Sequence, residues 1–276
     1  MSTVTTQTPL EQLKVAQQRI WSSGDYNRIA AITVPVAETL VDIAAPRPGD
    51  AVLDVATGTG HVALAAARRG AETTGLDYVP ELVAIARDRA TAEVLDVTFL
   101  EGDAEALPFP DASFDQVLSA IGVMFVADHQ RAASELVRVT RPGGRIALAS
   151  WTPTGFVGQM LTTVGAHVPP PAVAQPPTRW GNEQVVRELL GDGATDVKST
   201  TSSVTQRFAS AEAFADLFLT YYGPTHTAAS RLSDTGRTAL REDLVALADT
   251  SNRSGDGTVV CDWEYLVLTA TRREDG

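Results

Sequence analysis

A chain of 276 residues is long enough to bury one sizeable hydrophobic core, and a single domain of this length is common among α/β proteins. Hydrophobic residues make up 44% of the sequence and charged residues 20%, which excludes a disordered or fibrous chain. The formal net charge of −12, without a clustered basic stripe, disfavours nucleic acid and anionic membrane surfaces as partners.

Cysteine usage and the N-terminal sequence predict a cytoplasmic protein. The single cysteine, Cys261, cannot form an internal disulfide, so nothing requires an oxidising compartment. The start MSTVTTQTPLEQLK lacks a charged segment followed by an apolar one, and no apolar run reaches the length of a membrane span. We therefore expect a cytoplasmic monomer or homodimer whose partner is a small molecule, with neither nucleic acid nor membrane bound.

Residues 1–45 predict a helical N-terminal cap. In the stretch LEQLKVAQQRIW, the apolar residues Leu10, Leu13 and Ile20 recur at helical spacing. A turn at Gly24 and a second helix follow, with Pro35 inside the helical pattern as a possible break.

From residue 46 to residue 151, short apolar runs alternate with turn residues and alanine-rich helical stretches. The runs are AVLDVA, AETTGLD, VTFLEGD, FDQVLSAIG and GRIALASW. Strands that alternate with helices predict a parallel sheet that is covered by helices on both faces, with a ligand at the carboxyl ends of the strands. We expect this segment to be the ligand-binding core.

Residues 152–276 predict helical insertions and two closing strands. Helices are expected at 156–166, 184–190, 211–222 and 233–250, and the proline-rich PPPAVAQPP forms a stiff connection between the first two. The alternating DVKSTTSSVTQRF predicts one strand, and TVVCDWEYLVLTATRR predicts a last, antiparallel strand at the sheet edge. The whole chain is therefore predicted to be one α/β domain with a mostly parallel, seven-stranded sheet.

The stretch VLDVATGTGHVA places a glycine turn between a buried strand and an alanine-rich helix. Gly58 and Gly60 permit a sharp turn where a ligand approaches bare backbone, and the amides at the helix start point at that turn. Alone this signal is weak, because Gly58, Gly60 and Ala63 also satisfy the dinucleotide pattern of NAD enzymes.

The ends of the next strands make the signal more specific. Asp77 ends the second strand, where its carboxylate can accept two hydrogen bonds from ribose hydroxyls, and Asp103 ends the third. The fourth strand ends near Ser119 to Gly122. An acid, a second acid and small polar groups beside one glycine turn are much more specific than any single motif.

The segments GDAEALPFPDASFD and RVTRPGGR complete this set, and with them the chain resembles the Rossmann-like, class I S-adenosyl-L-methionine-dependent methyltransferases, in the small-molecule branch of the ubiquinone and menaquinone enzymes. The resemblance is strong from Leu53 to Trp151 and weaker in SSGDYNRIA and at RW with Gly181. It implies a Rossmann-like sheet, S-adenosyl-L-methionine as the cofactor and methyl transfer as the activity.

The same resemblance implies which residues bind the cofactor. Asp54 and the backbone of Ala56, Gly58 and Gly60 would hold its amino-acid part, Asp77 the ribose, Asp103 with Ala104 the adenine, and Ser119 would line the methionine end. Two tyrosines are further candidates. Tyr78 is expected either on the adenine face or in the core, and Tyr26 in the cap is a hypothesis for a lid over the cofactor.

One departure from the family pattern concerns its first glycine, which is Ala56 here. The backbone at this position must suit alanine, or the cofactor shifts.

No residue is assigned a catalytic role from the sequence. His129 lies at an expected helix start, where a solvated or capping role is favoured over catalysis. The same roles are favoured over catalysis for His61. The position of His61 at the first turn of the cofactor helix lowers its pKa and suits a neutral ring. No His or Cys cluster has metal-ligand spacing, so we expect no metal.

Residues around the core are the candidates for binding the methyl acceptor. They are Met124, Phe125, Trp151, Trp180, and the helix that carries Phe214, Phe218, Tyr221 and Tyr222. An aromatic stripe at helical spacing is more often core than pocket. Its position as an insertion nevertheless predicts a lid over a small, largely apolar or aromatic acceptor, in secondary or quinone-like metabolism, methylated by in-line displacement.

Two alternatives remain open at this point. An NAD-dependent oxidoreductase would share the glycine turn and Asp77, but Asp54 would be an unfavourable neighbour for its pyrophosphate. A homologue that binds the cofactor without methylating, as a cyclase or an accessory protein, would share the whole cofactor site, because function depends on the acceptor site.

Overall fold

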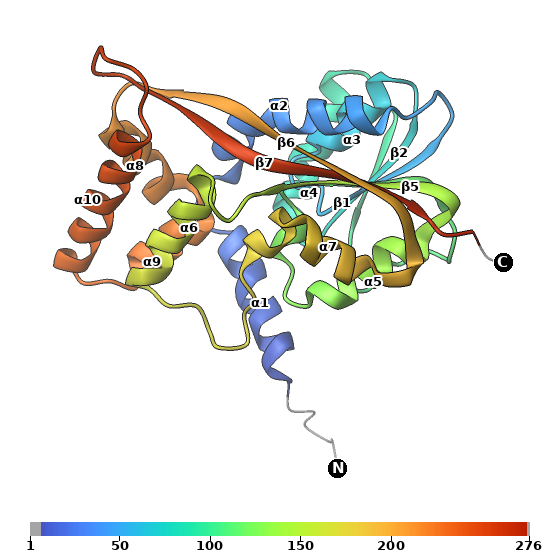
Figure 1. The fold of residues 1–276 in the computed structure, drawn as a ribbon, viewed down its shortest axis with the longest axis horizontal. Coiled ribbons are helices and arrows are strands. Elements are labelled where there is room, and N and C mark those ends of the chain that lie inside the picture. Colours follow the sequence, from blue (N-terminus) through green and yellow to red (C-terminus); the bar gives the residue numbers. More distant parts are fainter. Residues whose placement is uncertain (1–6, 275–276) are drawn as a thin grey trace.

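The computed structural model describes residues 7–274, and a seven-stranded sheet runs through their middle (Figure 1). The strands are β1 (Ala51–Val55), β2 (Glu72–Asp77), β3 (Val97–Glu101), β4 (Phe114–Ala120), β5 (Thr140–Trp151), β6 (Ala194–Phe208) and β7 (Val259–Arg272). Their order is β3-β2-β1-β4-β5-β7-β6. The first five strands are parallel and β7 is antiparallel to both of its neighbours, which confirms the predicted α/β class.

The position of β7 differs from the prediction. The last strand was expected at the sheet edge, but it lies between β5 and β6, and β6 forms the edge. The two sequences explain the order. In β7 the run Tyr265–Leu268 is buried throughout, as an interior strand requires, whereas β6 alternates serine and threonine residues that are mostly half-buried or exposed.

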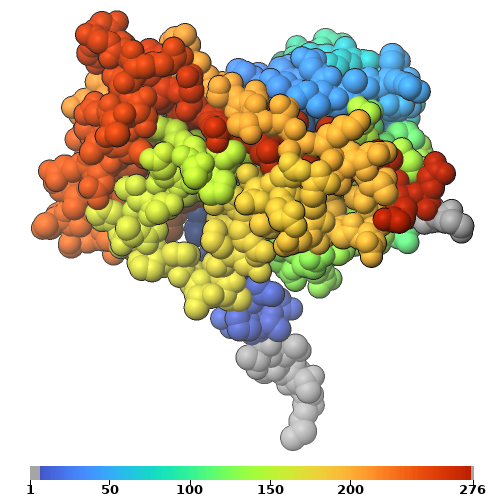
Figure 2. Space-filling view, in the orientation of Figure 1, coloured from blue at the N-terminus to red at the C-terminus, as the bar shows by residue number. Residues whose placement is uncertain are grey.

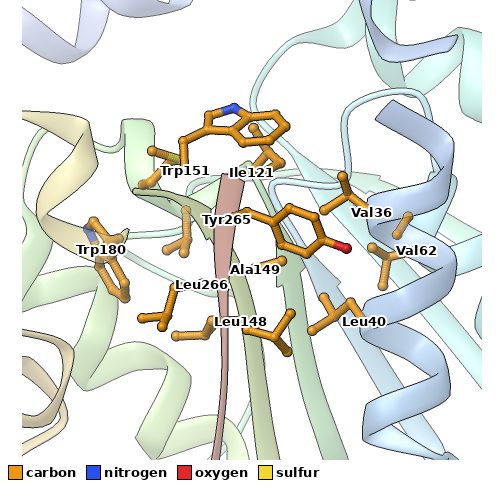
Figure 3. Packing of buried hydrophobic residues seen from close by; sticks show 14 of the residues in the cluster. Val36, Leu40, Val62, Ile121, Leu148, Ala149, Trp151, Trp180, Tyr265 and Leu266 are labelled. Carbon is orange, nitrogen blue, oxygen red and sulfur yellow. The ribbon is translucent and has the colours of Figure 1, made fainter. Parts of the chain in front are cut away.

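Helices cover both faces of the sheet, as predicted. One face carries α2 (Tyr26–Ala44), α3 (His61–Arg68) and α4 (Pro80–Ala92), and the other carries α5 (His129–Val139) and α7 (Glu183–Leu190) (Figure 1). Figure 3 shows the two apolar layers on either side of the strands, with Leu40 and Tyr265 on one side and Trp180 with Leu266 on the other. The hydrophobic core therefore lies on both faces of β5 and β7.

The possible break at Pro35 is not present, because α2 continues through it. Proline inside a helix removes one hydrogen bond and costs roughly 3 kcal/mol. The residues that follow, among them Val36, Leu40 and Val41, are completely buried against the sheet, and their packing outweighs that cost. The side chain of Gln206 also donates a hydrogen bond of 2.7 Å to the carbonyl of Ile32, in the turn of α2 that precedes Pro35.

Four helices gather at one end of the sheet, on the left of Figure 1. They are α6 (Phe156–His167), α8 (Ala211–Tyr221), α9 (Gly223–Ser230) and α10 (Asp234–Thr250). The single helix expected over 211–222 ends at Tyr221, and a second begins at Gly223. Short 3-10 turns complete the chain at η1 (Val123–Phe125), η2 (Pro177–Gly181) and η3 (Gly191–Gly193). Within residues 7–274, no helix is long and apolar enough to cross a membrane.

The N-terminal helix α1 (Pro9–Trp21) and the turn after it pack closely on the helical group. A Cβ atom added to Gly223 would lie 2.2 Å from the carbonyl oxygen of Ile20, and one added to Gly24 would lie 2.6 Å from that of Tyr221. The backbone amide of Asp25 donates to the same Tyr221 carbonyl at 3.2 Å. These close contacts hold α1 and the turn after it against α8 and α9. Together these elements cover one end of the sheet.

His129 has neither of the roles expected for it. Asp128 is the N-cap of α5, and its carboxylate accepts the amide of Arg131. The His129 side chain is buried, its ring centroid lies 5.8 Å from that of Trp180, and neither ring nitrogen has a hydrogen-bond partner. Burial, reinforced by the charge of Arg179, lowers the pKa of His129 to about 4.

A first prediction concerns acid stability. The unfolded chain holds His129 at its ordinary pKa near 6.5, so it binds more protons than the folded protein between pH 6.5 and 4, and stability is lost as the pH falls through this window. In His129→Phe this loss should be smaller by up to about 3 kcal/mol at pH 4. Urea unfolding of both proteins from pH 7 to pH 4 measures the difference, and equal losses in the two would contradict it.

Candidate functional site

An open pocket of about 950 Å³, including solvent at its mouth, lies at the carboxyl ends of β1 to β4. The order of the strands reverses between β1 and β4, which is where open α/β sheets bind ligands. Loops after four strands and residues of α1 and α2 line it: Lys14, Gln17, Trp21, Tyr26, Thr33, Ala37, Asp54, Ala56, Thr57, Gly58, Thr59, His61, Val62, Leu76, Asp77, Tyr78, Val79, Leu82, Gly102, Asp103, Ala104, Glu105, Ala120, Ile121, Gly122, Phe125, Val126 and Ala127. We call it the main pocket.

Asp54 at the end of β1 fixes the glycine turn to the following helix. One of its carboxylate oxygens, Oδ2, accepts the hydroxyl of Thr57 at 2.5 Å and the amide of Ala63 at 3.0 Å. Burial raises the pKa of Asp54 to about 7 despite both hydrogen bonds. The side chain therefore shapes the turn and also forms part of the pocket wall.

Asp77 at the end of β2 holds the same turn from the other side. Its Oδ2 accepts the amide of Gly58 at 2.8 Å, and its Oδ1 accepts the amide of Val79 at 3.0 Å. Burial raises the pKa of Asp77 to about 6. Each carboxylate oxygen can accept a further hydrogen bond from the pocket side, so the carboxylate can bind a pair of vicinal hydroxyls.

The backbone is strained at the ends of β1 and β4. Ala56, which replaces the first glycine of the family pattern, has a φ of 55°, a conformation that costs an L-residue about 1 kcal/mol. Gly122 makes room for it, because a Cβ there would lie 2.4 Å from the Ala56 carbonyl oxygen and 2.7 Å from the Ala56 Cβ. Ile121, beside it, has a φ of 61°, which is rare for a β-branched residue. Such strain gathers at ligand sites.

Helix α1 reaches over the mouth of the main pocket. The ammonium of Lys14 pairs with Asp103 at 2.6 Å and with Glu105 at 2.5 Å, and the side chain of Gln18 donates to the carbonyl of Tyr78 at 2.6 Å. Glu105 is itself buried, and its other oxygen accepts the amides of Ala127 and Asp128.

Sequence analysis missed Lys14 and Glu105. Lys14, Gln17 and Trp21 recur at helical spacing on one face of α1, a signal that was present but did not indicate where the helix docks.

Most of the residues predicted to bind the cofactor line the main pocket. They are Tyr26, Asp54, Ala56, Gly58, Asp77, Tyr78, Asp103 and Ala104. Gly60 and Ser119 do not. Gly60 is the left-handed N-cap of α3, and a Cβ there would lie 3.0 Å from the Phe99 ring. The buried hydroxyl of Ser119 donates to the Val55 carbonyl at 2.7 Å and accepts the Val123 amide at 3.0 Å, so it braces β1 against the end of β4.

A second cavity of about 320 Å³, including open solvent, adjoins the main pocket, and we call it the chamber. Its walls come from α1, α2, α6, α8 and the ends of β4, β5 and β7: Trp21, Tyr26, Ile29, Thr33, Ile121, Phe125, Trp151, Val157, Met160, Phe218, Tyr222 and Trp263. Among these described residues none is charged, and seven are aromatic. Trp21, Tyr26, Thr33, Ile121 and Phe125 line both cavities and form the boundary between them.

The predicted acceptor residues divide into two groups. Phe125 and Trp151 line the chamber, whereas Met124 and Trp180 are buried and line neither cavity. The ring of Tyr221 lies outside both, 4.9 Å below the guanidinium of Arg28, and its neighbour Tyr222 is the residue that reaches the chamber. Trp180 lies on the other face of the sheet from Tyr265, as Figure 3 shows.

The two histidines considered for catalysis are also separated. His61 lines the main pocket, and burial, followed by the charge of Arg89, lowers its pKa to about 4, in the direction expected. His129 lines neither cavity. Among residues 7–274 there is no group of three or more acidic, histidine or cysteine side chains that could hold a metal ion.

Comparison with known sequences identifies the family of this site. A model described as a methyltransferase domain matches residues 53–148. An uncharacterised protein of Mycobacterium tuberculosis is 42% identical over 266 residues, which cover 95% of this chain and 96% of that protein. A demethylmenaquinone methyltransferase of Thermus thermophilus is 48% identical over 115 residues, which cover 41% of this chain and 52% of that enzyme.

Comparison with solved structures gives the same fold. The YcgJ protein of Bacillus subtilis superposes with a TM-score of 0.59 at 21% identity, over 87% of this chain and 99% of that one. The [4+2]-cyclase SpnF superposes with a TM-score of 0.53, also at 21% identity, over 88% of this chain and 81% of that one. At these identities the likeness concerns the fold alone.

A second prediction tests Asp77 with S-adenosyl-L-methionine, the cofactor that the motifs imply. Affinity should fall as the pH drops through about 6, because a protonated carboxyl loses its charge and part of its capacity to accept hydroxyls. Asp77→Asn should bind roughly tenfold to a hundredfold more weakly and lose this part of the pH dependence. Calorimetry from pH 5 to pH 8 measures both effects.

The matched control is Asp88→Asn, the same change at an exposed position of α4. It should keep the affinity and the pH profile of the wild type. Equal binding by Asp77→Asn and wild type would remove Asp77 from the site.

A third prediction concerns Gly122. In Gly122→Ala the new methyl group would collide with the backbone of Ala56, so the ends of β1 and β4 must separate. We expect cofactor affinity to fall about tenfold or more, since small misplacements of site residues have large effects. Gly165→Ala is the control, because a Cβ there meets nothing closer than 4.0 Å. Calorimetry on both variants, with circular dichroism to verify folding, is the measurement. Unchanged affinity in Gly122→Ala would contradict the packing argument.

Proposed function

Because the chain belongs to the class I S-adenosyl-L-methionine-dependent methyltransferases, we propose that it transfers a methyl group to a small, uncharged, apolar or aromatic acceptor that is held in the chamber. The observation that carries this proposal is the pairing of an acidic main pocket with an uncharged aromatic chamber across a shared wall. Membership of this family favours methyl transfer over the NAD-dependent oxidoreductase that the glycine turn also allowed.

The residues of the main pocket fit the cofactor. The carboxyl groups of Asp54, Asp77, Asp103 and Glu105 line it against a single lysine, Lys14, which favours a cationic ligand. Gly58 exposes backbone to the pocket, since a Cβ there would meet only the Tyr26 ring at 3.6 Å. Asp77 would hold the ribose, Asp103 and Ala104 the adenine, and the turn after Asp54 the amino-acid end. When bound, the cofactor supplies a methyl group activated by a cationic sulfur.

The protein's part in the reaction is alignment and exclusion of water. The five residues shared by both cavities, with Tyr26 and Ile121 among them, would hold the acceptor in line with the activated methyl group. Such positioning contributes up to roughly 7 to 11 kcal/mol in well-oriented systems. The aromatic walls would also keep water from the acceptor, which favours transfer to an acceptor that has lost its proton, because its negative charge and the positive charge of the sulfur then disappear together.

The chamber offers no general base. Among its described residues there is no acidic side chain and no histidine. Burial raises the pKa of Tyr26 to about 12 and that of Tyr222 further, so both hydroxyls stay protonated near neutral pH. The proposed acceptor therefore loses its proton without help from the chamber wall, as an acidic phenol, enol or thiol does.

The similarity to demethylmenaquinone methyltransferase supports a quinone-like or phenolic acceptor only in part. It covers 41% of this chain. The seven aromatic side chains of the chamber support an aromatic acceptor independently. We further propose a cytoplasmic monomer or homodimer.

The experiment for this function uses cofactor labelled in the methyl group. The protein is incubated with it and a panel of small phenols, quinols, thiols and amines, and with an extract of source cells. Label in a small neutral product, together with released S-adenosyl-L-homocysteine, is the expected result. Intact cofactor with a changed acceptor would instead indicate a cyclase or another non-methylating activity, and cofactor that is not bound would reject the proposal.

A fourth prediction fills the chamber. Val157 on α6 lines it, so Val157→Phe should lower the kcat/KM for methyl transfer about tenfold or more and leave cofactor affinity unchanged. Val164→Phe makes the same change on the same helix at a buried position outside both cavities. Each variant should lose roughly 1 to 3 kcal/mol of stability from overpacking. Equal activity losses in the two variants would show that stability, and not the chamber, is responsible.

A further inference from the structure

Tyr222 carries an unpartnered hydroxyl at the wall of the chamber. Its ring is 96% buried, packed edge-on against Trp21 with centroids 5.7 Å apart and against Phe218 at 5.4 Å, so its orientation is fixed. Among the described residues no hydrogen bond reaches this hydroxyl, and it is not among the polar atoms sealed inside the core. Tyr222 lines the chamber, and its hydroxyl lacks the partner that a buried tyrosine usually has.

The other polar side chains of the chamber restrict what a ligand can offer. The hydroxyl of Thr33 already donates to the carbonyl of Ala30 at 2.9 Å. The remaining polar side-chain groups belong to the tyrosines Tyr26 and Tyr222 and to tryptophans, and an indole can only donate. Each of these groups can donate a hydrogen bond and only the two tyrosine hydroxyls can also accept one, so a ligand that presents an acceptor oxygen is the most widely complementary.

Tyr26 and Tyr222 face the same region. Both rings pack edge-on against Trp21, with centroid distances of 5.3 Å for Tyr26 and 5.7 Å for Tyr222. Tyr26 also lines the main pocket, whereas Tyr222 lines only the chamber. Both tyrosines therefore lie beside Trp21 in the chamber wall, and Tyr26 belongs to the part of that wall that is shared with the main pocket.

We propose that Tyr222 is a specificity-determining residue: its hydroxyl donates a hydrogen bond to an oxygen of the acceptor, and the acceptor is a neutral molecule of one or two rings that carries a hydroxyl or carbonyl oxygen. This inference rests on the proposed function and names the substrate class of the same site. The uncharged wall of the chamber, with its seven aromatic side chains, suits a ligand that carries rings.

A surface hollow lies among elements that also line the chamber. Figure 2 shows it between α6, in yellow-green, and the segment 168–180, in yellow, with atoms of the N-terminal segment in blue at its base. The same elements, α6 and α1, contribute Met160 and Trp21 to the chamber. In the proposal this hollow is where a neutral ligand enters, separately from the acidic main pocket.

The experiment compares two probes of the same shape. Acetophenone carries a carbonyl oxygen where α-methylstyrene carries a CH₂ group. Their affinities are measured by ligand-observed NMR titration with saturating S-adenosyl-L-homocysteine, which occupies the main pocket. Removing one hydrogen-bond donor in Tyr222→Phe should reduce the ratio of acetophenone to α-methylstyrene affinity about tenfold, with α-methylstyrene binding unchanged or tighter.

Tyr221→Phe is the matched control, since its ring lies outside both cavities in the next position of the chain. It should leave the ratio as in the wild type, and thermal midpoints verify that both variants are folded. An unchanged ratio in Tyr222→Phe, an equal change in Tyr221→Phe, or no binding of either probe to the wild type would each overturn the proposal.

The result is independent of methyl transfer. If the ratio depends on Tyr222 but no acceptor is methylated, the substrate class stands and the proposed reaction fails. If a product is labelled while the ratio is insensitive to Tyr222, the reaction stands and this inference fails.

Discussion

The whole site depends on one tight turn that two buried carboxylates hold in place. Asp54 accepts hydrogen bonds from Thr57 in the turn and from Ala63 at the start of α3. Asp77, at the end of the neighbouring strand, accepts the Gly58 amide. Both carboxyl groups are buried at a cost that their raised pKa values reflect. Because the turn donates hydrogen bonds to both carboxylates, through the Thr57 hydroxyl and the Gly58 amide, its backbone is held in a fixed position at the pocket.

The strained residues around this turn form a matched set. Ala56 takes a left-handed conformation that glycine would adopt without strain, and Gly122, just after the neighbouring strand β4, leaves space for its methyl group and carbonyl. Ile121 continues the strain into the wall shared by the two cavities. The departure from the family's first glycine is thus accommodated by a neighbour that lies 66 residues away in the sequence.

The chamber is assembled from segments that are far apart in the chain. Trp21 comes from α1, Phe218 and Tyr222 from the end of α8, and Trp263 from β7. Close backbone contacts at Gly24 and Gly223 join α1 to α8 and α9, whereas Asp54 and Asp77 hold the glycine turn, so the chamber wall and the turn are built from separate parts of the chain. Family members with one cofactor site can therefore differ in their acceptors.

The sequence by itself determined the strands, the alternation with helices and the acids at the strand ends, because these follow from local periodicity and from chemistry that the glycine turn requires. It placed Asp54, Asp77 and Asp103 correctly around one pocket. Only the tertiary structure decided that β7 lies inside the sheet, that Glu105 and Lys14 meet at the pocket mouth, and that Tyr222, not Tyr221 or Trp180, reaches the chamber. The physical reason is that an aromatic residue at helical spacing packs equally well against the core or a cavity, and the docking of distant helices selects between them.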